Sequence, residues 1–237
     1  MSQYVPPNST ELRPERMSST AYDVKNYAEI RRTVARLHQK IMSFTSRPAM
    51  MTCGKHLGIL RNNVFVFDNE IESHMLFDYL VYAYRPNGIN MAELYLRTNR
   101  STLDPVSIDL LERMSRCLYV YLEVHTVGPG NTTQMQDIIH NSPLTLVDNG
   151  LSTTLKPGQM LASHVLDLGS FFIQTGAIIS VDRRLTSCDE FIAAWTKWEK
   201  QGVYDVNISA KMARATMTSA IRLGLTEYTR TAELEES

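Results

Sequence analysis

The sequence predicts an α+β fold, in which a helical N-terminal part and C-terminal helices pack back on a small curled antiparallel sheet or barrel. Apolar residues follow helical spacing in the first part of the chain, alternate with polar residues in the middle, and return to helical spacing near the C-terminus. The 237 residues suffice for one large domain. With 43% hydrophobic and 21% charged residues and a net charge of −1, the composition excludes a disordered chain and a globally basic nucleic-acid binder.

The predicted helical part covers residues 19–116. Its first helix carries apolar side chains at alternating spacings of three and four, which form one stripe: Tyr27, Ile30, Val34, Leu37, Ile41 and Phe44. Pro48 disfavours continuation of this helix, and an apolar patch over 63–67 predicts a short strand. Further helices are expected over 69–84, 91–97 and 104–116.

Residues 117–182 are predicted to form about five short antiparallel strands. Over 118–125, apolar residues alternate with Tyr119, Tyr121, Glu123 and His125, a pattern typical of a half-buried strand. Turns that contain glycine or proline separate the later apolar runs. Because the region is too small for a sandwich, the strands are expected to curl into a small sheet or barrel.

Residues 183–225 are predicted to be helical again. Ser187 and Glu190 have the spacing of a capping box, and an aromatic face follows them in the sequence. A last helix over 209–223 has small side chains on one face, which would let another helix approach closely. This part is expected to pack back on the sheet.

The ends of the chain and its cysteines complete the predicted organisation. A flexible arm over 1–18 and an acidic tail over 226–237 are expected to flank one compact unit over 19–225. The three cysteines are 64 and 71 residues apart, a spacing that favours a reducing cytoplasm over a disulfide framework. The sequence contains no signal peptide and no apolar run of about 18 residues, so no membrane contact is expected.

Two histidines of the predicted sheet are candidates for acid–base catalysis. His125 shares a strand face with Glu123, and His164 lies near Asp167 in a later strand. A histidine paired with a carboxylate can exchange protons near neutral pH. Half-exposed strand histidines are more often structural, and the motifs of nucleotide-binding loops, serine hydrolases and zinc proteases are absent. No cofactor is expected.

Three side chains of the predicted helix over 69–84 have the spacing of metal ligands. Glu70, His74 and Asp78 follow one another at intervals of four, so their side chains could converge on zinc, iron or manganese. This spacing also arises by chance on an exposed helix face. Because no second cluster supplies the remaining ligands, no metal site is favoured.

Positive charge is concentrated early in the chain. Residues 25–55 contain seven Lys or Arg and one Glu, a local net charge of +6, and Arg32, Arg36 and Lys40 form one line on the first helix. Like charges at this spacing repel, so the line could bind an anionic partner, but a nucleic-acid or phosphate contact is not the favoured interpretation. Residues 62–84 carry four acidic residues and no Lys or Arg, so the favoured expectation is that the basic line faces either the chain's own acidic helix or solvent.

Several short stretches between residues 77 and 181 occur in a recognisable order. They are Phe77-Asp78-Tyr79, Arg85-x-x-Gly88, Leu94-Tyr95-Leu96, Gln136-Asp137-Ile138, Leu161-Ala162-Ser163-His164-Val165 and Thr175-Gly176-Ala177. Their order resembles a group of uncharacterised bacterial proteins, some of which carry a C-terminal SEC-C zinc motif. The resemblance implies a helical segment followed by a small β-meander and supplies no catalytic residues. The cysteine-dense SEC-C tail is absent here, so its zinc site is not carried over.

The function favoured by the sequence is a non-catalytic protein-interaction or assembly protein that associates with itself through its helices. The apolar stripe of the first helix, the small-residue face of the last helix and the complementary charge blocks support this interpretation. Two alternatives remain open: a hydrolase-type enzyme that uses a His/carboxylate pair, and a nucleic-acid-binding module that uses the basic helix. The expected partner is another protein or a second copy of the chain.

Overall fold

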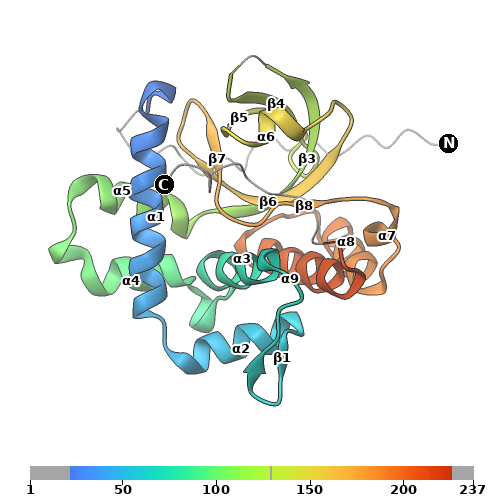
Figure 1. Cartoon of the computed structure of the whole chain (residues 1–237), viewed down its shortest axis with the longest axis horizontal. Helices are drawn as coiled ribbons and strands as arrows, with labels where there is room; N and C mark the ends of the chain where they lie inside the picture. The colour runs from blue at the N-terminus through green and yellow to red at the C-terminus, as the bar shows by residue number, and fades with distance from the viewer. Residues whose placement is uncertain (1–21, 129, 226–237) are drawn as a thin grey trace.

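In the computed structural model, which describes residues 22–128 and 130–225, a small β-barrel sits on a layer of helices (Figure 1). Helices precede the barrel in the sequence and helices follow it, so the predicted α+β class is confirmed. The arm expected over 1–18 and the tail expected over 226–237 lie outside the described residues.

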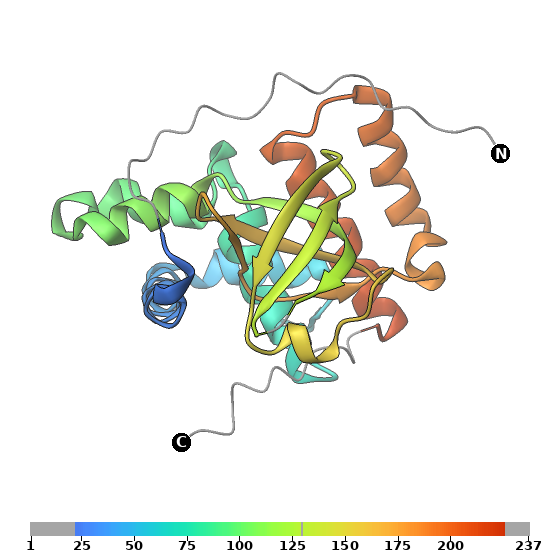
Figure 2. The same ribbon diagram turned by 90° about the horizontal axis from the view of Figure 1, so that it is seen from above.

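The first long helix, α1 (Tyr27–Phe44), follows a 3-10 turn at Val24–Asn26 and runs along one side of the barrel (Figure 2). It buries the predicted apolar stripe: Tyr27, Ile30, Val34, Leu37 and Ile41 are each 5% exposed or less in the core of the same chain. The prediction that this stripe mediates self-association is corrected accordingly, since its apolar side chains already pack within one chain. Only Phe44, at the end of the stripe, keeps an exposed ring.

A second helix, α2 (Arg47–Leu57), begins where the sequence suggested an interruption. The Ser46 hydroxyl accepts a hydrogen bond from the Ala49 backbone N–H, and Pro48 lies in the first turn, where its missing N–H costs nothing. A short hairpin of β1 (Leu60–Arg61) and β2 (Val64–Phe65) follows.

The predicted helix over 69–84 is present but changes geometry. The α-helix α3 (Glu70–Asp78) continues into a π-helical turn at Tyr79–Ala83, all five residues of which are buried beneath the barrel. After a 3-10 turn at Pro86–Gly88, the chain forms α4 (Met91–Asn99), a 3-10 turn at Arg100–Thr102, and α5 (Pro105–Ser115).

The barrel has five strands in a circular order. The strands are β3 (Leu118–Val127), β4 (Thr132–Asp137), β5 (Ser142–Val147), β6 (Met160–Asp167) and β7 (Phe172–Gln174). They pair in the order β3-β4-β5-β7-β6, and β6 closes the ring on β3; all pairs are antiparallel except β5 with β7. The short helix α6 (Leu151–Thr154) lies between β5 and β6, and β8 (Ile179–Ser180) adds to β6. This connectivity is that of the OB-fold barrel.

The two faces of β3 explain how the barrel joins the helices. Val120, Leu122 and Val124 point into the barrel interior, while Tyr119 and Tyr121 point outward. The outward tyrosines are buried too, because helices cover this side of the barrel. The prediction of a half-buried strand is therefore wrong for the central residues of β3, which are buried on both faces.

The C-terminal helices are α7 (Arg183–Thr186), α8 (Asp189–Gln201) and α9 (Val206–Leu223). The small-residue face of α9 packs against β3 and the π-helical turn. Helix α8 packs on α9, on the opposite side of the barrel from α1 (Figure 2). The predicted capping box is not formed, because Cys188 is the N-cap and the Ser187 hydroxyl bonds the Arg183 carbonyl. No helix in the described part of the chain is long and apolar enough to cross a membrane.

Candidate functional site

A buried polar network joins the end of α3 to the barrel. His164 on β6 donates its Nδ1–H to Asp78 Oδ2 at 2.6 Å, and both side chains are 1% exposed. The hydroxyl of Thr175, which follows β7, donates to the other carboxylate oxygen at 2.7 Å. Gly176 permits this approach, since a Cβ at that position would lie 3.0 Å from Asp78 Oδ1. Both oxygens of the Asp78 carboxylate are therefore occupied by protein donors.

A second polar pair lies beside this network. His38 Nε2 is 2.6 Å from the Tyr82 hydroxyl, and the Tyr82 ring lies 5.2 Å from the His164 ring. Burial lowers the pKa of His38 to about 4. Burial also raises the pKa of the Tyr82 hydroxyl. These groups line neither of the two concavities described below, and their contacts hold α1, α3 and the barrel together.

The structure places the predicted catalytic residues apart. His164 has a carboxylate partner, but it is Asp78; the exposed Asp167 instead accepts a hydrogen bond from the Gly169 N–H in the next turn. His125 is exposed at a β-bulge in β3. Among the described residues, no hydrogen bond or ion pair joins His125 to Glu123. Neither predicted His/carboxylate pair is assembled.

The three candidate metal ligands also separate. Glu70 Oε1 and His74 Nε2 are 3.9 Å apart on the exposed face of α3, whereas Asp78 is buried against His164. Eight residues of α-helix turn a side chain about 80° from its starting direction, enough to move it from the surface to the core. No group of three potential ligand residues occurs within the described ranges.

The basic line of α1 faces solvent. Arg32, Arg36 and Lys40 are exposed, and the guanidinium groups of Arg32 and Arg36 bond atoms of their own helix. No ion pair between this line and α3 occurs in the part of the chain that is described, so of the two expected surroundings, the acidic helix or solvent, the structure shows solvent.

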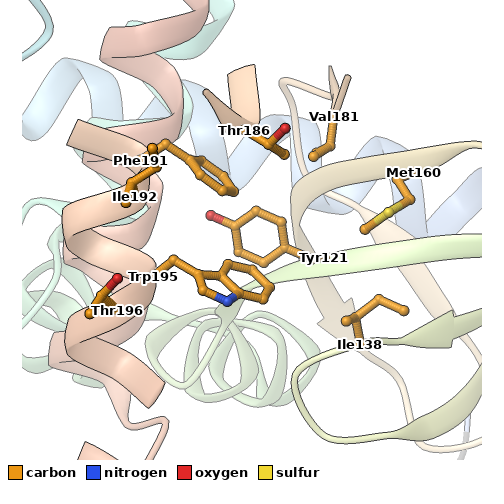
Figure 3. A pocket seen from close by; sticks show the side chains of 9 residues that line it. All are labelled: Tyr121, Ile138, Met160, Val181, Thr186, Phe191, Ile192, Trp195 and Thr196. Atoms are coloured by element: carbon orange, nitrogen blue, oxygen red, sulfur yellow. The ribbon is translucent and has the colours of Figure 1, made fainter. Parts of the chain in front are cut away.

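Two open concavities are described in the structure. One, of about 390 Å³, lies where α8 ends and α9 begins, and its lining includes the charged Asp205 and Lys211. The other lies between the barrel and α8 (Figure 3). Its volume is about 310 Å³, and none of the residues that line it is charged: Tyr121, Ile138, Met160, Val181, Thr186, Phe191, Ile192, Trp195 and Thr196. We call it the aromatic pocket. The Tyr121 ring meets the Trp195 ring edge to face at 5.2 Å, and Phe191 stacks on Trp195 at 5.7 Å.

The polar atoms of these rings already have partners. The Tyr121 hydroxyl bonds the Thr216 hydroxyl at 2.6 Å, and burial raises its pKa. Trp195 Nε1 donates to Glu199 Oε1 at 3.0 Å. The walls of the aromatic pocket therefore present mostly carbon to a ligand.

A histidine that the sequence analysis did not single out lies near this pocket. Asp137 ends β4, and its Oδ2 accepts the Nδ1–H of His140 at 2.6 Å. Ile138, between the two, lines the aromatic pocket. A row of rings also connects them: His140 lies 5.6 Å from Tyr204, Tyr204 6.0 Å from Trp198, and Trp198 4.9 Å from Trp195. The only signal in the sequence is an aspartate three residues before a histidine at a strand end.

One family model matches the chain, and it does so over residues 21–185. Its description, Family of unknown function (DUF7986), is consistent with the resemblance to uncharacterised proteins. No curated protein and no solved structure matches the chain significantly. Because the matched region spans more than half of the sequence and includes α1, the Asp78–His164 network and the barrel, the chain belongs to the Family of unknown function (DUF7986).

Proposed function

We propose that the protein is a non-catalytic interaction protein that holds an apolar side chain of a partner protein in the aromatic pocket. The observation that carries the proposal is the contrast between two sites. The Asp78–His164 pair is sealed in the core, while the aromatic pocket is open to solvent and has uncharged walls. An accessible site with uncharged aromatic walls favours binding of an apolar group over acid–base catalysis.

The composition of the pocket favours a protein partner over a polar small molecule. Tyr, Trp, Phe and Met are the residue types enriched in protein interfaces, and all four occur in its walls. A polar ligand would find few unsatisfied groups, because the ring hydroxyl and indole N–H already bond to protein. A volume of about 310 Å³ suits a single bulky side chain as anchor.

The alternatives have less support from the geometry. In an OB-fold barrel the second and third strands commonly bind nucleic acid, and such sites combine aromatic rings with positive charge. The equivalent strands here, β4 and β5, contain no aromatic residue, Lys or Arg. The exposed basic line of α1 contributes no residue to either of the two described concavities. A hydrolase of the kind considered would need an accessible His/carboxylate pair or thiol nucleophile. The exposed His125 bonds no carboxylate among the described residues, and burial raises the pKa of the Cys53 thiol.

The proposal also covers self-association and the cellular compartment. A second copy of the chain would qualify as partner only through an apolar side chain that enters the aromatic pocket, because the α1 stripe is internal. We keep the cytoplasm as the proposed compartment, since the three cysteines are buried free thiols.

Selection from a random peptide library displayed on phage tests the proposal. Peptides enriched on the folded protein should share a bulky apolar residue, and its replacement by alanine should weaken binding about 30-fold. Ile192→Asp places a charge at the pocket and should abolish capture. Val106→Asp is the matched control, because Val106 is 46% exposed on α5 and Ile192 is 45% exposed on α8.

Two results would overturn the proposal. One is a library in which no peptide is enriched on the wild-type protein. The other is a set of peptides that bind the Ile192→Asp and Val106→Asp variants equally well. Light scattering of the same variants decides whether a second copy occupies the pocket, since self-association through it should fail only in Ile192→Asp.

A further inference from the structure

We infer that Tyr228, which lies in residues 226–237 of the chain, occupies the aromatic pocket of the same chain until a partner's side chain displaces it. This inference goes beyond the proposed function, because it names an occupant that is present before any partner binds. It makes the C-terminal residues of the chain a competitor for the pocket.

The C-terminal end of α9 is fixed next to the aromatic pocket. The Arg222 guanidinium, in the last turn of α9, bonds both carboxylate oxygens of Glu190, at 2.5 and 2.7 Å. Glu190 is in the first turn of α8 and is followed directly by two residues that line the pocket. The described chain ends only three residues after Arg222, at Leu225. Residues 226–237 therefore start from the α8 side of the barrel, where the pocket lies.

Tyr228 is the first bulky residue after this point. It follows Arg222 by six residues, which an extended chain spans in about 20 Å, and the pocket lining begins one residue after the ion-pair partner of Arg222. A tyrosine buries its ring and keeps its hydroxyl in water, so walls with few free polar groups accept it. Its ring can meet the rings in the wall edge to face or in an offset stack.

The N-terminal residues start on the other side of the barrel. Tyr22, the first described residue, bonds Asp109 on α5 through its hydroxyl and Ser170 through its backbone carbonyl. It precedes α1, and α1 and α8 lie on opposite sides of the barrel (Figure 2). Tyr4, the one aromatic residue of the sequence before Tyr22, would therefore have to be drawn around the barrel to reach the pocket.

The covalent connection makes even a weak occupant effective. A ligand joined to its site by a short linker acts at an effective concentration of the order of 1 mM. With a Kd of about 0.1 mM for the separate segment, the pocket would be filled about nine-tenths of the time. Only the remaining tenth is free for a partner, so the apparent affinity for the partner is about tenfold lower.

Fluorine NMR of the full chain tests the inference without a partner. The chain has two tryptophans, Trp195 in the wall of the pocket and Trp198 three residues later, so 5-fluorotryptophan gives one resonance for each (Figure 3). Tyr228→Ser should shift the Trp195 resonance. Leu234→Ser, the matched control farther along the same segment, should leave it in place. An unshifted Trp195 resonance in Tyr228→Ser, equal shifts in both variants, or a shift produced by Tyr4→Ser would each overturn the inference.

Dilution of the labelled protein separates an occupant in the same chain from one in a second copy. The difference between the wild-type and Tyr228→Ser spectra should persist on tenfold dilution, because the segment and the pocket belong to one chain. If the difference fades on dilution and light scattering shows a dimer, the occupant is the segment of a second copy and the inference is wrong.

A peptide selected in the test of the proposed function supplies a second measurement. It should bind Tyr228→Ser about tenfold more tightly than wild type, and it should bind Leu234→Ser with wild-type affinity. Equal affinity for all three proteins would remove the inference and leave the proposed function standing, provided that Ile192→Asp still abolishes binding. If no peptide is enriched but the Trp195 resonance depends on Tyr228, the proposed function fails and the occupied pocket stands.

Discussion

Acidification should destabilise the protein through His38. The imidazole lies on α1 and bonds the Tyr82 hydroxyl of the π-helical turn at 2.6 Å. Burial lowers its pKa from 6.5 to about 4, against the opposing influence of Asp78, which favours the protonated form. Protonation would place a charge where α1 docks on the core, so the folded state resists it.

The size and sign of the effect follow from these two pKa values. Above pH 6.5 the imidazole is neutral in both states and contributes no pH dependence. As the pH falls below 6.5, the unfolded chain binds the proton first, so the free energy of unfolding decreases until the folded state is protonated near pH 4. The loss is about 2 kcal/mol at pH 5 and about 3 kcal/mol at pH 4.

Urea denaturation at pH 7, 5 and 4 measures this loss. Other groups also titrate over this range, so the informative quantity is the wild-type loss minus that of His38→Gln, which cannot take up the proton. His74→Gln is the control, because His74 is half exposed on α3. Wild type and His74→Gln should lose stability together and exceed His38→Gln by the amounts above. Equal losses in all three proteins would refute the reasoning.

Three further predictions concern the core. Asp78→Ala should lower the free energy of unfolding by about 3–5 kcal/mol, because His164 loses its buried partner; urea denaturation at pH 7 measures this, and a loss under about 1 kcal/mol would contradict the pairing. Gly176→Ala should cost about 1–3 kcal/mol in thermal melts, because its Cβ would crowd the Asp78 carboxylate, whereas an unchanged melting temperature would show that the carboxylate can move. Leu37→Ala should cost about 2–5 kcal/mol. Leu37→Asp should unfold the chain, as circular dichroism would show. A folded variant that is monomeric in light scattering where the wild type is oligomeric would instead restore the α1 stripe as an interface.

Periodic patterns of apolar residues predicted the helices and strands well, but they did not predict what packs against each face of these elements. The stripe of α1 identified a helix with one apolar face, but apolar spacing is the same whether that face meets another chain or its own core. Tyr119 and Tyr121 show the same limit, since alternation along β3 cannot reveal that helices more than sixty residues away cover the tyrosine face. Pro48 indicates a helix end because it lacks an N–H, but the same residue is favourable in a first turn after Ser46.

The polar sites escaped prediction for a different reason. Asp78 and His164 are 86 residues apart, and each was paired in sequence with a neighbour that the fold separates from it. Only the closure of the barrel and the burial of the π-helical turn bring the two together. Asp137 and His140 are close in sequence, but they lie in a turn, where no periodic pattern marks which side chains will meet.

The arrangement of the helices around the barrel explains why the proposed binding site is the aromatic pocket and not the usual outer face of an OB-fold barrel. In the usual OB-fold site, rings on the outer face of the barrel meet the ligand directly. Here the outward ring of Tyr121 is on β3 and lies beneath α8, while the outer faces of β4 and β5 carry no aromatic residues. Helix α8 contributes Phe191 and Trp195, so the ring surface is shared between the barrel and a helix. Because α8 packs on α9 and α9 packs on β3, the aromatic pocket is built from a helix and a strand that are connected through a third element, rather than from the barrel surface alone.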